Sequence, residues 1–124
     1  MQRAISTSKA PQAIGPYSQA VMTDGFLFLS GQIPLDAETG GMEHDVKKAT
    51  KLIFENIKEI LREGGLTLDD IVKTTVFLTN LDNFAKINEV YETVFKSPYP
   101  ARSTVQVSRL PKDAAVEIEC IAKC

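Results

Sequence analysis

The sequence predicts an α+β fold in which a single-layer mixed sheet of about six strands carries two helices packed on one face. Two segments repeat apolar residues at helical spacing, and the remaining apolar runs have the length of strands. No repeat, low-complexity segment or linker interrupts the 124 residues. We therefore expect a single domain over residues 1–124.

Both helices are predicted from the spacing of their apolar residues and from their ends. Residues 45–63 end at the pair Gly64 and Gly65, which is a helix stop signal. Residues 83–95 form the second helix, with Asp82 as the expected N-cap. The apolar stripes consist of Val46, Ala49, Leu52, Ile53, Ile57, Ile60 and Leu61 in the first helix and of Phe84, Ile87, Tyr91, Val94 and Phe95 in the second.

The strands are predicted from the other apolar runs. They cover residues 26–30, 71–79, 101–107 and 116–122, with shorter candidates near residues 3–6 and 18–21. Strand 71–79 alternates, which places Val72, Thr74, Val76 and Leu78 on one face. Residues 26–29 are apolar on both faces, and two helices can cover only one side of the sheet. The uncovered apolar side predicts an oligomer.

Charge and hydropathy exclude several classes of partner. Lys and Arg number 14 against 16 Asp and Glu, so the net charge of -2 provides no basic face for a phosphate backbone, and nucleic acid is not an expected partner. No run approaches twenty apolar residues, and residues 1–5 lack the apolar core of a signal peptide. We expect no membrane association and a cytoplasmic location.

Cofactor chemistry has little support in the sequence. Cys120 and Cys124 lie four residues apart, roughly 13 Å in a strand, which exceeds the disulfide limit of about 7 Å. Both are expected to be free, Cys120 in the core and Cys124 exposed. With His44 as the one histidine, no metal-ligand cluster or nucleophile–base pair is predicted. The glycine doublets do not form a phosphate-binding loop, and we expect no cofactor.

Residues 99–107 contain the most informative pattern, Tyr-Pro-Ala-Arg-Ser-Thr-Val-Gln-Val. Arg102 stands at the mouth of a strand, behind Pro100, which restricts the backbone leading to it. A guanidinium offers a planar fork of donors that matches the two oxygens of a carboxylate and stays charged at biological pH. Arg102 is therefore a candidate carboxylate receptor; the local alternative is an exposed arginine with no ligand.

Three further segments accompany this one: Ile14-Gly15-Pro16-Tyr17-Ser18-Gln19-Ala20, Ser30-Gly31-Gln32-Ile33-Pro34, and residues 110–119, Leu-Pro-Lys-Asp-Ala-Ala-Val-Glu-Ile-Glu. Together the four segments resemble, in order and spacing, the signatures of the RidA family (YjgF/YER057c/UK114). The resemblance runs from about Ser6 to Ala122. It implies a homotrimer of chorismate-mutase-like subunits with active sites in the clefts between subunits.

The resemblance also implies the two central site residues. Arg102 takes the role of binding the substrate carboxylate, and Glu117 that of positioning and polarising the hydrolytic water. Glu117 and Glu119 share one strand face, and their spacing alone favours a solvated surface over a glycosidase pair of catalytic carboxylates. The resemblance selects Glu117, because the family's glutamate stands in the context Lys-Asp-x-x-x-Glu, fifteen residues after its arginine.

The resemblance implies the remaining site residues as well. Tyr17 is expected to line the pocket, Ser30 and Gly31 to shape its wall, and Asn88 to contribute a polar side chain. Asn88 borders the apolar stripe of its helix, so its amide must find partners, either the substrate or nearby backbone. The family often has Cys two residues after the arginine, where this chain has Thr104. A thiol nucleophile is therefore not required, and Thr104 is a candidate substrate contact.

The implied activity is hydrolytic deamination of 2-imino and 2-enamino acids, in particular 2-iminobutanoate and 2-iminopropanoate, to 2-keto acids and ammonia. Such a hydrolase of carbon–nitrogen bonds acts in metabolite damage control, on imino acids that pyridoxal-phosphate dehydratases form from Ser or Thr. Two alternatives remain open: a small-carboxylate-binding regulatory module without efficient turnover, and an RNA-acting translation inhibitor. The joint presence of Arg102 and Glu117 favours the enzyme, because a receptor needs only the first.

The placement of these two residues depends on strand pairing. If residues 101–107 and 116–122 form a hairpin about residues 111 and 112, Arg102 lies opposite residue 121. Glu117 is then four residues, or roughly 13 Å, along the strand. In that arrangement a neighbouring subunit has to complete the site.

Overall fold

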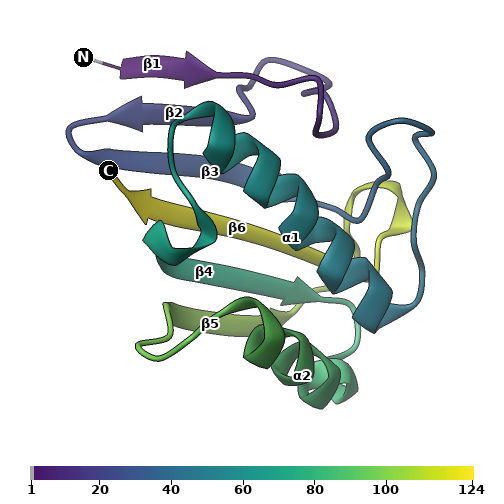
Figure 1. The fold of residues 1–124 in the computed structure, drawn as a ribbon. Coiled ribbons are helices and arrows are strands. Elements are labelled where there is room, and N and C mark those ends of the chain that lie inside the picture. Colours follow the sequence, from purple (N-terminus) through teal and green to yellow (C-terminus); the bar gives the residue numbers. More distant parts are fainter. Residues whose placement is uncertain (1) are drawn as a thin grey trace.

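Six strands form one mixed sheet in the computed structural model, which describes residues 2–124 (Figure 1). The strands are β1 Gln2–Ile5, β2 Ala20–Thr23, β3 Phe26–Gln32, β4 Ile71–Leu78, β5 Ala101–Gln106 and β6 Val116–Lys123. Their order in the sheet is β1-β2-β3-β6-β4-β5. The β4–β5 pair is parallel and the other pairs are antiparallel, so the sheet is mixed, as predicted.

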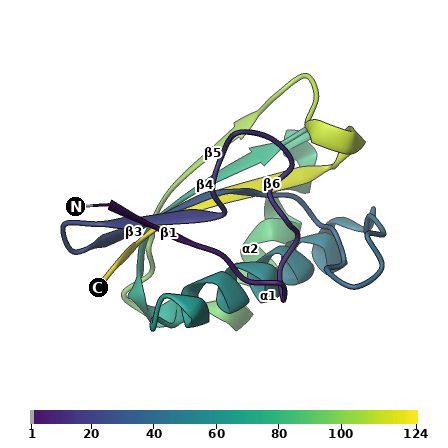
Figure 2. The same ribbon diagram turned by 90° about the horizontal axis from the view of Figure 1, so that it is seen from above.

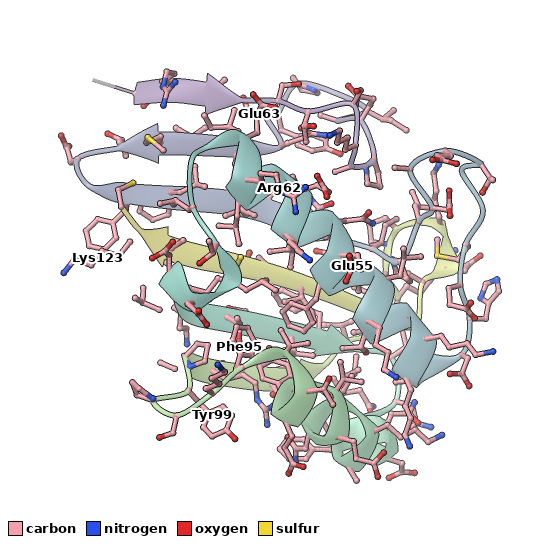
Figure 3. The ribbon with its side chains drawn as sticks, viewed as in Figure 1. Glu55, Arg62, Glu63, Phe95, Tyr99 and Lys123 are labelled. Carbon is pink, nitrogen blue, oxygen red and sulfur yellow. The ribbon has the colours of Figure 1, made fainter. Side chains whose placement is uncertain are left out.

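Both helices, α1 Val46–Glu63 and α2 Phe84–Val94, pack on the same face of the sheet (Figure 2). Asp45 caps α1 by accepting the Lys48 backbone N–H at 3.1 Å, and Gly65 follows its end with a φ of 79°. The exposed side chains of Glu55, Arg62 and Glu63 lie on the outer surface of α1 (Figure 3). Within residues 2–124, no helix combines the length and apolar character needed to cross a membrane.

The core lies between the helices and the sheet. Leu27, Val76, Leu78, Val116 and Ile118 are fully buried on the helix-facing side of their strands, opposite the apolar stripe of α1. Aromatic side chains join the two helices: the rings of Phe54, Tyr91 and Phe95 contact one another with centroids 5.3 Å apart.

Neither helix of the described residues covers the opposite face of the sheet (Figure 2). This face carries exposed apolar side chains. Phe26, Phe28 and Val105 remain 41%, 44% and 43% exposed on it. Leu27 and Leu29 of the same β3 strand are buried on the helix side, which confirms that β3 is apolar on both faces.

Two local predictions were wrong. Asp82 is not the N-cap of α2: the helix follows a 3₁₀ turn, Leu81–Asn83, in which the Asn80 side chain accepts the Asp82 N–H at 3.0 Å. Val72 does not join Thr74, Val76 and Leu78 on the buried face. The pairing of β4 with β6 shifts between Ile71 and Lys73, so that Ile71 is buried and Val72 is 42% exposed.

The predicted hairpin between residues 101–107 and 116–122 was also wrong. Strand β4 lies between β5 and β6 and pairs with both of them. Arg102 is level with Thr74 of β4, which is in turn level with Cys120 of β6. Strand β5 forms its backbone hydrogen bonds with β4, which runs parallel to it. The short 3₁₀ turn Pro111–Asp113 is part of the connection from β5 across the sheet to β6.

Candidate functional site

Arg102 projects from β5 toward α2 and lies over two aromatic rings. Its guanidinium carbon lies 5.1 Å from the centroid of Phe84 and 4.7 Å from that of Tyr91. Both distances fall within the range in which a ring face attracts a cation. The side chain is therefore held at a defined place on the protein surface.

Asn88 completes this arrangement with a hydrogen bond. Phe84, Asn88 and Tyr91 share one side of α2, and the Arg102 Nη2–H donates to Asn88 Oδ1 at 2.7 Å. Arginine has no acceptor, so the amide oxygen must face it, and the Asn88 Nδ2 donors point elsewhere. The question that the sequence left open is thus answered in part: Asn88 binds the arginine side chain rather than nearby backbone.

No carboxylate neutralises Arg102 among the described residues. The ion pairs of residues 2–124 are Lys47–Glu89, Arg62–Glu59 and Arg109–Asp113. Around the guanidinium lies a pocket lined by Asn88, Tyr91, Glu92, Tyr99, Pro100 and Arg102, here called the arginine pocket. Tyr99, on the loop that leads into β5, is 54% exposed at its edge (Figure 3). A half-buried guanidinium with free donors is suited to bind an anionic group.

Thr104 lies on the same side of β5 as Arg102, two residues along. Its hydroxyl oxygen is buried and has no hydrogen-bond partner within residues 2–124. An unpaired buried hydroxyl costs about 1–3 kcal/mol, so proteins seldom retain one without a partner. Thr104 therefore has an unused donor and acceptor close to the arginine pocket.

Glu117 lies on the other side of the sheet, against Gly31. The pairing of β3 with β6 shifts between Leu29 and Gln32, and a β-carbon added at Gly31 would come within 2.8 Å of the Glu117 carboxyl carbon. Only glycine permits this approach. Burial raises the pKa of Glu117 above its usual value, and the charge of Glu119 raises it further. Glu117 is thus a half-buried carboxylate with increased basicity.

Tyr17 and Gly31 line a second pocket, the Gly31 pocket, together with Gln19, Gln32, Lys112 and neighbouring residues. Tyr17 is 54% exposed, and its phenol oxygen accepts the Ile14 backbone N–H at 3.3 Å. The Ser30 hydroxyl donates to the Ser18 carbonyl at 2.6 Å, so its proton is already used, and Ser30 is not among the residues that line the Gly31 pocket. Sequence reasoning did not identify Lys112 as a residue of this pocket. Its backbone has a φ of 55°, a conformation that the amino-acid composition does not indicate.

One chain does not bring Arg102 and Glu117 together. Cys120 of β6 is level with Arg102 across β4, and Glu117 precedes Cys120 by three residues along β6. The strand rise and spacing then separate the two Cα atoms by about 14 Å, and the side chains leave opposite faces of the sheet. The structure thus brings Arg102 together with Asn88, and Glu117 together with Gly31, in two separate places.

Metal ligands do not gather in the described part of the chain. Residues 2–124 contain no group of three or more His, Cys, Asp or Glu side chains arranged to hold an ion. His44 is exposed. Cys120 and Cys124 are free, the first buried and the second exposed, as predicted, and burial raises the pKa of Cys120 to about 12.

Comparison with known proteins gives these positions a family context. Residues 7–124 match the family model described as Endoribonuclease L-PSP. The chain is similar to the 2-iminobutanoate/2-iminopropanoate deaminase of Salmonella typhimurium, with 47% identity over 125 residues and 98% of each chain covered. It is also similar to a RutC family protein of Pyrococcus abyssi, with 55% identity over 119 residues that cover 95% of this chain and 94% of the relative.

Solved structures show the same fold. A structure of Escherichia coli TdcF with bound serine superposes with a TM-score of 0.94 at 49% identity, and 98% of each chain is covered. RidA from the Antarctic bacterium Psychrobacter superposes with a TM-score of 0.95 at 45% identity, covering 98% of this chain and 99% of that one.

The raised pKa of Glu117 predicts how stability depends on pH. The folded protein binds this proton more tightly than the unfolded chain, so the free energy of unfolding falls as the pH rises from below 4.5 through the raised folded value. We expect Glu117→Gln to melt at or above the wild-type temperature at pH 7, and the difference to shrink as the pH falls toward 4.5. Thermal melts at matched concentration measure this. A variant several degrees less stable at pH 7 would identify the carboxylate as a structural partner.

Proposed function

Because this chain belongs to the RidA family (YjgF/YER057c/UK114), we propose that it hydrolyses 2-imino and 2-enamino acids to 2-keto acids and ammonia. The proposed substrates are 2-iminobutanoate and 2-iminopropanoate, which appear in the name of the Salmonella relative. The observation that carries the proposal is Arg102, a half-buried guanidinium with no carboxylate partner within residues 2–124.

The arginine pocket supports binding of the substrate carboxylate. One Nη2–H of Arg102 is engaged by Asn88, and the remaining N–H groups can form a two-pronged pair with a carboxylate. In our proposal the Thr104 hydroxyl and the free Nδ2 group of Asn88 also contact the substrate. These contacts fix the position of C2, the carbon that water attacks.

Glu117 is the proposed base for the hydrolytic water. As a water oxygen bonds to C2 of the protonated imine, Glu117 accepts one water proton and a carbinolamine forms. Glu117 then returns that proton to the nitrogen and the C–N bond breaks. Ammonia leaves as the C2 hydroxyl gives its proton to the regenerated Glu117 carboxylate and becomes the keto group, and Glu117 finally passes this proton to ammonia or solvent. The raised pKa of Glu117 makes it a stronger base than an exposed glutamate. In our proposal Tyr17, Ser30 and Gly31 shape the wall near the substrate.

A homotrimer is the proposed form of the active enzyme. Arg102 and Glu117 leave opposite faces of one sheet, so a complete site needs the arginine pocket of one subunit beside the Gly31 pocket of the next. The apolar face with Phe28 and Val105 offers an interface for such an assembly. The free cysteines fit a reducing compartment, and we propose a cytoplasmic location.

The direct test is an assay of ammonia or keto-acid release from freshly generated 2-iminopropanoate and 2-iminobutanoate. The protein is expected to accelerate release well above the spontaneous rate. Glu117→Gln, the matched control, is expected to lower turnover on the order of 10² to 10⁴ fold while keto-acid binding survives. Keto-acid binding without acceleration would identify a regulatory module instead.

Arg102→Lys tests the two-pronged contact. The substitution preserves the charge but replaces a planar fork by a single ammonium, and we expect a loss of about 1.5–3 kcal/mol, or ten- to hundredfold in kcat/KM. The oligomeric state and Tm should remain close to those of the wild type. Near-normal deamination by this variant, or dissociation of its oligomer, would show that Arg102 has another role.

Thr104→Val tests the unpaired hydroxyl. If the hydroxyl contacts the substrate, kcat/KM should fall about three- to tenfold, while Tm stays equal or rises because the buried orphan oxygen is gone. Thr104→Ser keeps the hydroxyl and is the control, expected within about threefold of wild type. Full activity in the valine variant would leave Thr104 with a packing role only.

A further inference from the structure

Two of the side chains that contact Arg102, those of Phe84 and Tyr91, have no substrate contact in the proposed reaction. Phe84 lies on one side of the guanidinium and Tyr91 on another, at 5.1 and 4.7 Å. Resting on the function proposed above, we propose that Phe84 and Tyr91 are positioning residues, which orient Arg102 so that its free N–H groups face the substrate carboxylate.

A buried hydrogen bond fixes the Tyr91 ring. The hydroxyl groups of Tyr91 and Thr74 lie 2.8 Å apart, and Thr74 is fully buried. Thr74 is also the residue of β4 that is level with Arg102 of β5. Strand β4 thus pairs with Arg102 through the residue Thr74, and the same residue holds the Tyr91 ring that Arg102 contacts.

The core holds the same ring from other sides. Phe54 meets Tyr91 edge-on at 84°, and Phe95 meets it at 47°, both with centroids 5.3 Å away. Burial raises the pKa of Tyr91 to about 12, so the phenol stays neutral at physiological pH. Its contact with Arg102 is therefore that of a cation on a neutral ring, which leaves the guanidinium charge available for a ligand.

Phe84 gives an independent reason for the proposal. The core does not bury this side chain: Ile87 and Tyr91 of the same helix are 0% and 5% exposed, whereas Phe84 is 41% exposed. A ring placed there adds little to the core but covers the guanidinium. Together with the Asn88 hydrogen bond, the two rings restrict an otherwise flexible side chain before ligand binds, which lowers the entropic cost of binding.

Phe84→Leu tests the outer ring, because it keeps an apolar side chain but removes the ring face. We expect the affinity for 2-oxobutanoate, measured by calorimetry, and kcat/KM to fall about three- to tenfold, mainly through KM, with Tm within a few degrees of wild type. Phe84→Tyr restores a ring and should stay within about twofold of wild type. Equal affinity in the leucine variant and the wild type would overturn the proposal.

A double-mutant cycle separates positioning from general stability. If Phe84 acts through Arg102, the Phe84→Leu effect should shrink to less than about twofold in an Arg102→Lys background. If Phe84 only stabilises the fold, it should cost the same factor in both backgrounds, and the proposal is overturned.

The inner ring needs a paired substitution, because Tyr91→Phe alone leaves the buried Thr74 hydroxyl without a partner. The double variant Thr74→Val with Tyr91→Phe keeps both shapes and removes only the hydrogen bond. We expect a two- to fivefold rise in KM with kcat and Tm nearly unchanged. Wild-type KM in this variant would overturn the role of the hydrogen bond.

These tests also separate this proposal from the function on which it rests. Wild-type protein that binds 2-oxobutanoate without deaminating imines, and binds it more weakly with Phe84→Leu, would refute the enzyme and support the positioning role. Normal deamination that Phe84→Leu does not change would support the enzyme and refute the positioning role. A protein that neither binds the keto acid nor turns over imines would overturn both.

Discussion

The position of β4 between β5 and β6 is the constraint on which the rest of the site depends. It sets Arg102 and Glu117 two strands apart, and the alternation of side chains directs them to opposite faces of the sheet. A sheet is one layer of hydrogen-bonded backbone, so side chains on its two faces cannot meet through it. Each subunit therefore presents two half-sites, and in our proposal catalysis depends on assembly.

In both half-sites the central charged group, Arg102 or Glu117, forms no ion pair within residues 2–124. The Arg102 guanidinium donates a hydrogen bond to the Asn88 amide and contacts the rings of Phe84 and Tyr91. Glu117 lies against Gly31, and burial and the charge of Glu119 raise its pKa. Neither arrangement is the most stable that a protein could build, because a direct ion pair would neutralise both groups. In our proposal, their separation leaves the guanidinium free for a substrate carboxylate and leaves the Glu117 carboxylate basic enough to accept a proton from water.

Much of this could be predicted from the sequence, and the failures have physical causes. The helices and the two-faced β3 strand follow from local periodicity. The candidate site residues rest on the family resemblance, and their roles stay predictions. The hairpin of residues 101–107 with residues 116–122 does not form, and long-range pairing leaves no local signal of this: residues 101–107 pair in parallel with β4 rather than with the next strand along the chain. The exposure of Val72 was not predicted for the same reason, because it results from the shift in register between β4 and β6. The contact of Phe84 with Arg102 was not predicted, because Phe84 has the same helical spacing as the core residues of α2.

Co-expression of two inactive variants tests most directly whether the site is shared between subunits. Arg102→Met retains an intact Glu117, and Glu117→Gln retains an intact Arg102, so a mixed trimer contains one complete site wherever the two kinds of chain meet in the right order. Random assembly in equal amounts should restore about a quarter of wild-type deaminase activity, whereas either variant alone remains inactive. A mixture as inactive as its parents would contradict the account, because it would mean that one chain supplies both residues of each site.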